Sequence, residues 1–160
     1  DTAALMIEGA DVTHKVKNTH TIEIVEQRLL VEPGSFVLDI QQAAPYFRKQ
    51  GALGFINSFV NNALPGMKHP ITGVFDVLEL LYHTHPTHQN GLSIAVSHDT
   101  ILAAIVAVIS GQTEIQQSDW PDMMEGLFVW FEGEDFANSK LKWIWRGQKQ
   151  ELLIKDFKEK

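Results

Sequence analysis

The sequence predicts an α/β fold: a mostly parallel central sheet with helices on both faces and an antiparallel hairpin near the C-terminus. The first observation behind this prediction is the apolar segment 92–96, which leads into the almost wholly apolar run 101–109. An interior strand followed by a helix has this pattern. The second observation is a pair of aromatic segments, 127–132 and 141–146, joined by a short polar connection, which predicts a hairpin. Helices and strands alternate in the order expected for such a sheet.

The first half of the chain is predicted to be mainly helical. Residues 2–8 present an apolar face, which favours a helix. Residues 21–26 alternate in polarity and are rich in β-branched side chains, so we expect a strand there. Residues 39–50 and 51–64 have helical patterns, and Asp39 stands where an N-cap is expected. Pro45 lies inside the first of these two helices, where it either interrupts the helix or starts a new one.

The second half contains the clearest amphipathic pattern. Residues 72–83 place their apolar side chains on one helical stripe, and a polar loop is expected over residues 83–90. After the hairpin, residues 150–154 are predicted to add one more short strand. The tail, residues 155–160, is charged, and we expect it to be frayed.

Length and composition narrow the class of protein. The chain has 160 residues, of which 44% are hydrophobic and 21% charged, so we expect a single globular domain spanning residues 1–160. The net charge of -7 argues against a nucleic-acid partner or an anionic membrane surface, because both require clustered Lys and Arg. The absence of cysteine excludes disulfides, thiolate catalysis and Cys-based zinc sites. No run approaches the roughly 18 apolar residues of a membrane helix.

The first candidate site is the pair His98 and Asp99, at the corner between the predicted strand and helix. Ligands of α/β sheets bind beyond the carboxyl ends of the strands. There, a histidine can contact a phosphate or transfer a proton. From spacing alone, the simpler interpretation of Asp99 is an N-cap that accepts from backbone amides near Leu102. His98 alone is equally compatible with a buried, hydrogen-bonded histidine.

A second candidate site is the cluster His83, His85 and His88, since imidazole is a ligand of zinc, nickel and copper. This spacing does not place the three rings on one helix face, and Pro86 breaks any helix there. No carboxylate lies close by in the sequence. A solvated loop is therefore the simpler interpretation, and a metal-binding domain stays an alternative.

Four tryptophans form a third feature. Trp143 and Trp145 fall on one face of a predicted strand, as do Phe128 and Trp130, and Trp120 lies in a connection. We expect these side chains to pack in the core or at the sheet edge, while a stacking platform for a sugar or a base is the alternative. The glycines match neither of the phosphate-cradling loops GxGxxG and GxxxxGK[ST].

The run of residues 93–104, Ser-Ile-Ala-Val-Ser-His-Asp-Thr-Ile-Leu-Ala-Ala, resembles the C-terminal signature of the histidine phosphatase superfamily. It is most similar to the acid-phosphatase branch, in which a strand ends in His-Asp-Thr and a helix of small residues follows. Residues 1–6 resemble the helix after the phosphate-binding arginine of that family. The predicted helix 72–83 before the signature agrees, and so does Trp120-Pro121 followed by the strand 127–132. This resemblance implies a phosphoglycerate mutase-like fold.

The resemblance also implies a function, phosphomonoester hydrolysis through a phosphohistidine. In that family, a histidine in an Arg-His-Gly motif attacks phosphorus, and two arginines and a second histidine hold the phosphoryl oxygens. His98 corresponds to the second histidine, and Asp99 corresponds to the acid that protonates the leaving group. A protonated imidazole at a helix start suits a transferring phosphoryl group. The resemblance implies no cofactor and no metal.

The sequence departs from the family pattern in one major respect. It contains no Arg-His-Gly, and its three arginines, Arg28, Arg48 and Arg146, lie in no matching motif. The chain begins at Asp1 without an initiator methionine and already within a predicted helix. We therefore expect a family member that is incomplete at its N-terminus, with the nucleophile and one strand outside this sequence, and no turnover by the 160-residue chain alone.

Three hypotheses follow. The first is the phosphomonoesterase just described, acting on a small-molecule or protein phosphomonoester. The second is a catalytically inactive truncated relative or anion-binding module. The third is a metal-binding α/β domain that uses His83, His85 and His88. The sequence decides neither the substrate, nor phosphatase against mutase activity, nor the compartment or oligomeric state.

Overall fold

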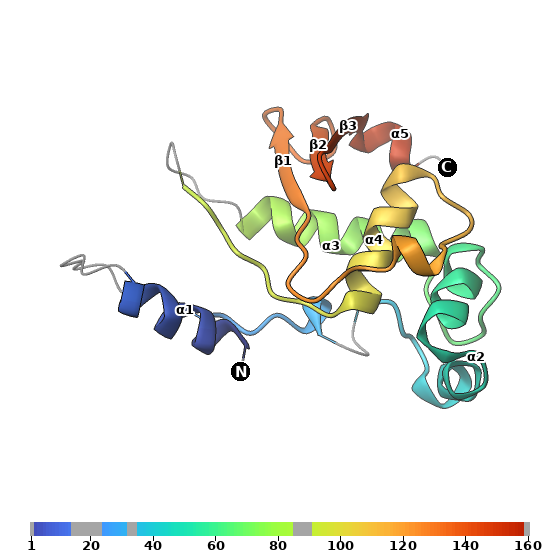
Figure 1. Ribbon diagram of the computed structural model, residues 1–160. Coiled ribbons are helices and arrows are strands. Elements are labelled where there is room, and N and C mark those ends of the chain that lie inside the picture. Colours follow the sequence, from blue (N-terminus) through green and yellow to red (C-terminus); the bar gives the residue numbers. More distant parts are fainter. Residues whose placement is uncertain (1, 14–23, 32–34, 85–90, 159–160) are drawn as a thin grey trace.

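The computed structural model describes residues 2–13, 24–31, 35–84 and 91–158 (Figure 1). Within these ranges the chain forms, in order, α1 (Thr2–Thr13), η1 (Arg28–Leu30), α2 (Ile40–Val60), α3 (Pro70–Thr84), α4 (Asp99–Ser110), η2 (Gln117–Asp119), β1 (Phe128–Glu132), β2 (Lys140–Trp145), β3 (Gln148–Leu153) and α5 (Ile154–Lys158). The predicted mixture of helices and sheet is confirmed.

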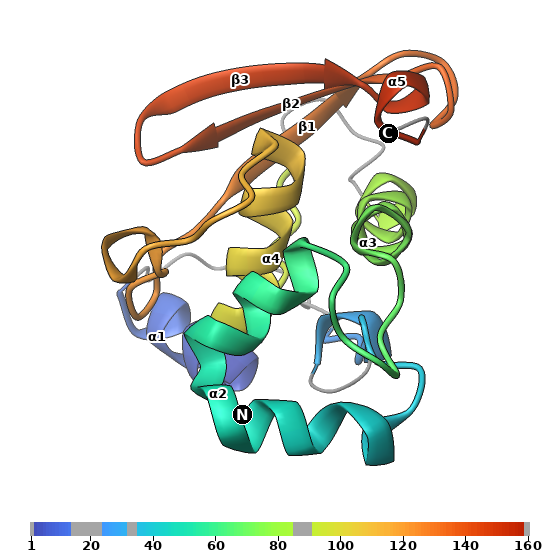
Figure 2. The same cartoon turned by 90° about the vertical axis from the view of Figure 1, so that its right-hand side faces the viewer.

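The helix α4 lies at the centre of the molecule. Figure 2 shows it between α2 and α3, with the three-stranded sheet across one end. Residues 103–109 are all buried, which is why this segment is apolar on every side and not only along one stripe. Its alanines, Ala103, Ala104 and Ala107, are small enough to let the neighbouring helices approach closely. The helix ends at Gly111, whose left-handed backbone (φ 70°) is the usual C-terminal stop.

The sheet is antiparallel, in the order β1-β2-β3, so the predicted hairpin and third strand are confirmed. The side chain of Trp143 in β2 lies opposite Val129 in β1, and Leu141 lies opposite Phe131. Leu141 and Trp143 are fully buried, which places this face of the sheet on the core. The two-residue turn between β2 and β3 has positive φ at both Arg146 and Gly147, as tight hairpins require.

The helix α2 confirms the predicted cap. Asp39 Oδ1 accepts hydrogen bonds from the backbone N–H groups of Gln41 (2.9 Å) and Gln42 (3.3 Å). The side-chain amide of Gln42 also donates to this carboxylate, and these bonds lower the pKa of Asp39. Pro45 lies inside the helix without ending it. The two predicted helical segments meet instead at a kink at Gly51 (φ 68°, ψ 178°).

The strand predicted at residues 92–96 is not present. Residues 91–98 run from α3 toward α4 without regular secondary structure, and Leu92 and Ile94 are 76% and 67% exposed (Figure 1). A strand requires a hydrogen-bonded neighbour, and no described segment pairs with these residues. The sheet in the described part of the chain is therefore the antiparallel C-terminal one, and a parallel central sheet is not seen there.

Other boundaries differ from the predictions. The first helix continues past residue 8 to Thr13. Ile24 and Val25, which were predicted to lie in a strand, are exposed and are not part of any strand. The other residues of that predicted strand, 21–23, lie outside the described ranges. The prediction of a frayed tail is wrong for residues 155–158, which belong to α5, and residues 159–160 lie outside the described ranges. Ile154 and Phe157 are buried three positions apart, so one helical face anchors this segment to the core.

Candidate functional site

The corner at the start of α4 holds both residues of the first candidate site. His98 is the N-cap residue, with an extended backbone (φ -99°, ψ 153°), and its side chain makes no capping hydrogen bond. Its carbonyl oxygen accepts from the N–H of Leu102 at 3.0 Å. The interpretation of Asp99 as the N-cap is therefore wrong, because Asp99 is the first helical residue and the amide of Leu102 is already satisfied.

The carboxylate of Asp99 is held from two sides. Its Oδ1 accepts from the backbone N–H of Thr100 at 2.8 Å, and its Oδ2 accepts from the indole Nε1–H of Trp120 at 2.9 Å. A negative charge in the first turn also interacts favourably with the helix dipole. Asp99 is exposed, so a carboxylate of fixed orientation is presented to solvent beside His98.

Trp120 is itself held in place by Arg146, which stands in the turn between β2 and β3. The guanidinium donates to the backbone carbonyls of Ser118 (2.7 Å) and Trp120 (2.9 Å). It also forms two hydrogen bonds to the carboxylate of Glu125, at 2.7 and 2.9 Å. These bonds lower the pKa of Glu125 and raise that of Arg146. A continuous set of hydrogen bonds thus joins the sheet to Asp99.

Sequence reasoning missed this set of contacts. Trp120 and Asp99 are 21 positions apart, as are Arg146 and Glu125, and no periodic pattern links residues at that separation. The available signals were the Trp120-Pro121 pair and the scarcity of arginine in this chain. The structure brings Trp120 to the candidate site, whereas Arg28 and Arg48 make no contact with His98 or Asp99 that the structure describes.

The segment before the corner is held by two side-chain hydrogen bonds. Ser97 Oγ donates to the carbonyl oxygen of Leu30 at 2.7 Å, which ties the segment to η1. Upstream, Ser93 Oγ donates to the carbonyl oxygen of Thr84 at the end of α3. Leu92, just before the first contact, and Ile94, between the two contacts, are both exposed.

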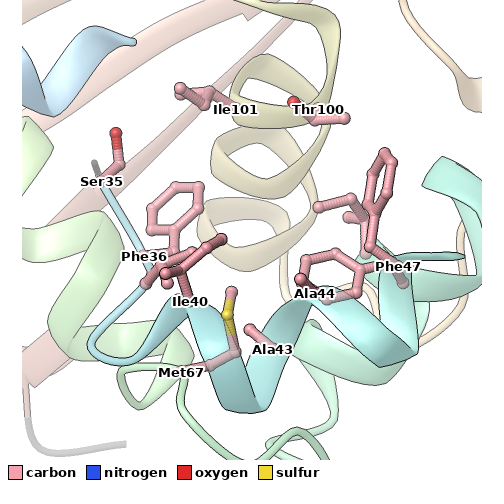
Figure 3. Close-up of a pocket in the computed structure, with 12 residues that line it drawn as sticks. Ser35, Phe36, Ile40, Ala43, Ala44, Phe47, Met67, Thr100 and Ile101 are labelled. Carbon is pink, nitrogen blue, oxygen red and sulfur yellow. The ribbon is translucent and has the colours of Figure 1, made fainter. Parts of the chain in front are cut away.

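An apolar pocket of about 190 Å³ lies against the first turn of α4. Figure 3 shows Thr100 and Ile101 of α4 across from Ile40, Ala43 and Ala44 of α2. Further aromatic and apolar side chains close the pocket, among them Phe36, Phe47, Phe55 and Met67.

Phe36 occupies its place in this pocket because α3 carries a glycine behind it. A Cβ atom at Gly73 would lie 2.6 Å from Cδ1 of Phe36, so any larger residue at that position would displace the ring. On its other side, the ring stacks on Phe59 at a centroid distance of 4.8 Å.

The histidine cluster is only partly described. His83 lies in the last turn of α3, is exposed, and packs edge-to-face with Tyr82 at 5.3 Å. His85 and His88 lie outside the described residues. Among the residues that are described, no three His, Cys, Asp or Glu side chains are arranged to hold a metal ion. The metal-binding hypothesis therefore stays a prediction.

The tryptophans divide between the two faces of the sheet. Trp143 is buried and Trp145 packs against the core, as expected. In the edge strand β1, Phe128 and Trp130 share one face, as predicted, but this is the outer face: Val129 and Phe131 face the core, while Phe128 is 65% exposed. Trp130 shares the outer face and lies under the ammonium group of Lys149, 5.4 Å from the ring centroid.

No family model, curated protein sequence or solved structure matches this chain. The described helices include none that is both long enough and apolar enough to cross a membrane.

Proposed function

We propose that this chain supplies the phosphate-contact histidine, His98, and the proton donor, Asp99, of a histidine-type phosphomonoesterase. The observation that carries the proposal is the carboxylate of Asp99. It is held at the start of α4 by hydrogen bonds from the indole of Trp120 and from the backbone N–H of Thr100. It directly follows His98, which is exposed and whose side chain makes no capping hydrogen bond. The resemblance of residues 93–104 to the histidine phosphatase signature supports the same assignment. The nucleophilic histidine would come from a segment outside these 160 residues.

The proposed chemistry assigns one task to each side chain. The nucleophilic nitrogen attacks phosphorus and the bond from phosphorus to the ester oxygen breaks. Protonated Asp99 transfers its proton to that oxygen, so the alcohol leaves neutral. The imidazolium of His98 and the N-terminus of α4 stabilise the charge on the phosphoryl oxygens. Asp99 then accepts a proton from the water that attacks the phosphohistidine, which releases phosphate and restores both groups.

The proposal includes a finer fold than the described residues contain. A phosphoglycerate mutase-like sheet would place residues 91–98 beside a strand from outside this sequence. Two features support this arrangement. The segment is extended and carries the exposed apolar side chains Leu92 and Ile94. Its unpaired backbone is also a template for strand addition.

The test is an assay of the natural gene product, expressed from its own start codon, on 4-nitrophenyl phosphate. We expect an upstream Arg-His-Gly segment, a folded Asp99→Asn protein that has lost about 10²- to 10⁴-fold in kcat, and a phosphohistidine trapped by rapid quenching. The matched control is Asp156→Asn in α5, an exposed carboxylate away from the corner, which should keep full activity.

Several results would contradict the proposal. A start codon at Asp1, or an Asp99→Asn variant with wild-type kcat, would remove its basis. Robust turnover by the 160-residue chain alone would place the nucleophile within these residues. Saturable phosphate binding without turnover by the natural product would support an anion-binding module instead.

A further inference from the structure

We propose that the apolar pocket beside Thr100 binds the leaving group of the phosphomonoester, and that this group is a single aromatic ring. The preferred substrates would then be aryl phosphates and not sugar phosphates. This inference rests on the proposed function for its phosphate contact at His98, whereas the pocket itself does not depend on that function.

The position of the pocket supports this role. Thr100 and Ile101 line it, and they follow His98 and Asp99 directly in the chain. With a rise of about 1.5 Å per residue, the pocket begins within one helical turn of the proposed phosphate site. Thr100 and Ile101 are buried on the side of α4 that faces α2 (Figure 3). The carboxylate of Asp99 is held by Trp120, which directly follows η2.

The chemistry of the lining excludes polyhydroxylated leaving groups. Phenylalanine, isoleucine, methionine and alanine side chains make up most of the wall, and none of the lining residues is charged. A sugar placed there would leave its hydroxyl groups without partners, which is costly in an apolar site. Among the lining residues, Ser35 and Thr100 have a polar side-chain atom, and Ser35 Oγ is buried without a hydrogen-bond partner among the described residues.

The size of the pocket selects a small ring. An apolar cavity of about 150 Å³ is known to accommodate benzene, whereas drug-sized ligands occupy about 300–1,000 Å³. The pocket volume of about 190 Å³ therefore fits one phenyl ring with a small substituent. A fused ring would fit this volume less well than a single ring.

The test uses NMR titrations of the natural gene product, the protein in which the proposed phosphate site would be complete, with four probes: phenyl phosphate, phenol, glucose 6-phosphate and inorganic phosphate. We expect phenyl phosphate to bind about 10- to 100-fold more tightly than inorganic phosphate or glucose 6-phosphate, since burial of the ring adds to the phosphate contact. The amide resonances that shift should centre on Ala44, Thr100 and Ile101.

Two variants locate the ring in the pocket. Ala44→Phe should fill the pocket and abolish the advantage of phenyl phosphate. Ala52→Phe, the same substitution in the same helix but outside the lining, should preserve it. Phe47→Ala removes a partly exposed wall and should admit 2-naphthyl phosphate, so the proposal stays testable if Ala44→Phe fails to fold.

The outcomes separate this inference from the proposed function. Equal affinity for phenol and phenyl phosphate, unchanged in His98→Ala, would overturn the phosphate contact and with it the leaving-group role. Equal affinity for phenyl phosphate, glucose 6-phosphate and inorganic phosphate, unaffected by Ala44→Phe, would overturn the aromatic pocket while the phosphate contact survives. Failure of all four probes to bind would overturn both.

Discussion

Two stretches of this chain with apolar side chains, β2 and residues 91–98, differ in whether they pair with a neighbouring strand. The strand β2 pairs on both sides, and Leu141 and Trp143 are buried beneath it. Residues 91–98 pair with nothing in the described part of the chain, and Leu92 and Ile94 face outward. The difference lies in the neighbours, because β2 is flanked in sequence by the strands that pair with it, whereas residues 91–98 lead directly into α4. An apolar, strand-like sequence thus forms a strand only where another segment of the chain is available to pair with it.

Hydrogen exchange should reveal this difference most strongly. Backbone amides of β2 bonded into the sheet should exchange only through large-scale opening. Amides of residues 91–98 should exchange almost as fast as in an unfolded chain. We expect protection factors that differ by at least about 10³-fold, measured by NMR or mass spectrometry. Comparable protection in both stretches would mean that residues 91–98 have acquired a partner, for example a second copy of the chain.

A matched pair of leucine truncations should show the next largest effect. Leu141→Ala removes a fully buried side chain and should lower the free energy of unfolding by about 2–5 kcal/mol. Leu92→Ala removes a side chain that is 76% exposed and should change it by less than about 0.5 kcal/mol. Urea denaturation measures both values. Similar losses in the two variants would contradict the exposure of residues 91–98.

The contact between Trp120 and Asp99 should contribute less, and a double-mutant cycle isolates it. Trp120→Phe removes the indole donor and Asp99→Ala removes the acceptor, so their effects should fall short of additivity by about 1 kcal/mol. The control cycle pairs Trp120→Phe with Asp156→Ala in α5, where we expect additivity. An indole proton resonance that is unmoved in Asp99→Ala would show that this hydrogen bond is absent in solution.

The ion pair that supports Trp120 should give the smallest effect, with a defined pH dependence. Arg146 lowers the pKa of Glu125 in the folded state, so the pair stabilises the fold above the unfolded-state value of about 4.3. This contribution is lost as the pH falls through the lower folded-state pKa. Both side chains are partly exposed, so Glu125→Gln should cost less than about 1 kcal/mol at pH 7 and progressively less as the pH falls below about 4.3.

Thermal unfolding across this pH range measures the difference between Glu125→Gln and the unmodified chain. Glu79→Gln in α3 serves as the control, because Glu79 is exposed and forms no ion pair within the described residues. If the Glu125→Gln deficit grew as the pH fell, the sign of the argument would be wrong.

The parts of the fold that follow from local sequence were predictable. The cap at Asp39, the amphipathic α3 and the hairpin depend on neighbours within a few residues, and each is confirmed. The faces of β1 were not predictable from alternation, because aromatic residues occupy both faces. The register with β2 selects Val129 and Phe131 for the core. That residues 91–98 do not form a strand was also not predictable, because their apolar pattern does not reveal whether a neighbouring strand is available to pair with them.

The candidate site divides in the same way. His98 and Asp99 are adjacent in sequence, so their presence at one corner was predictable from a strand-like run followed by a helix. The contacts that orient Asp99 come from Trp120, and through it from Arg146, across turns that bring distant residues together. The pocket beside Thr100 is similar, because it forms where residues 35–37, α2 and α4 meet.

Phe36 packs closely against Gly73 of α3. The residue at position 73 therefore affects the size of the pocket beside Thr100, although α3 does not line that pocket. Gly73→Ala would add one methyl group, and the ring of Phe36 would have to move toward the space between α2 and α4. Exchange at this single position, with every wall residue unchanged, would therefore change the volume of the pocket. A substitution in α3 can thus reshape the pocket while the corner at His98 and Asp99 keeps its residues.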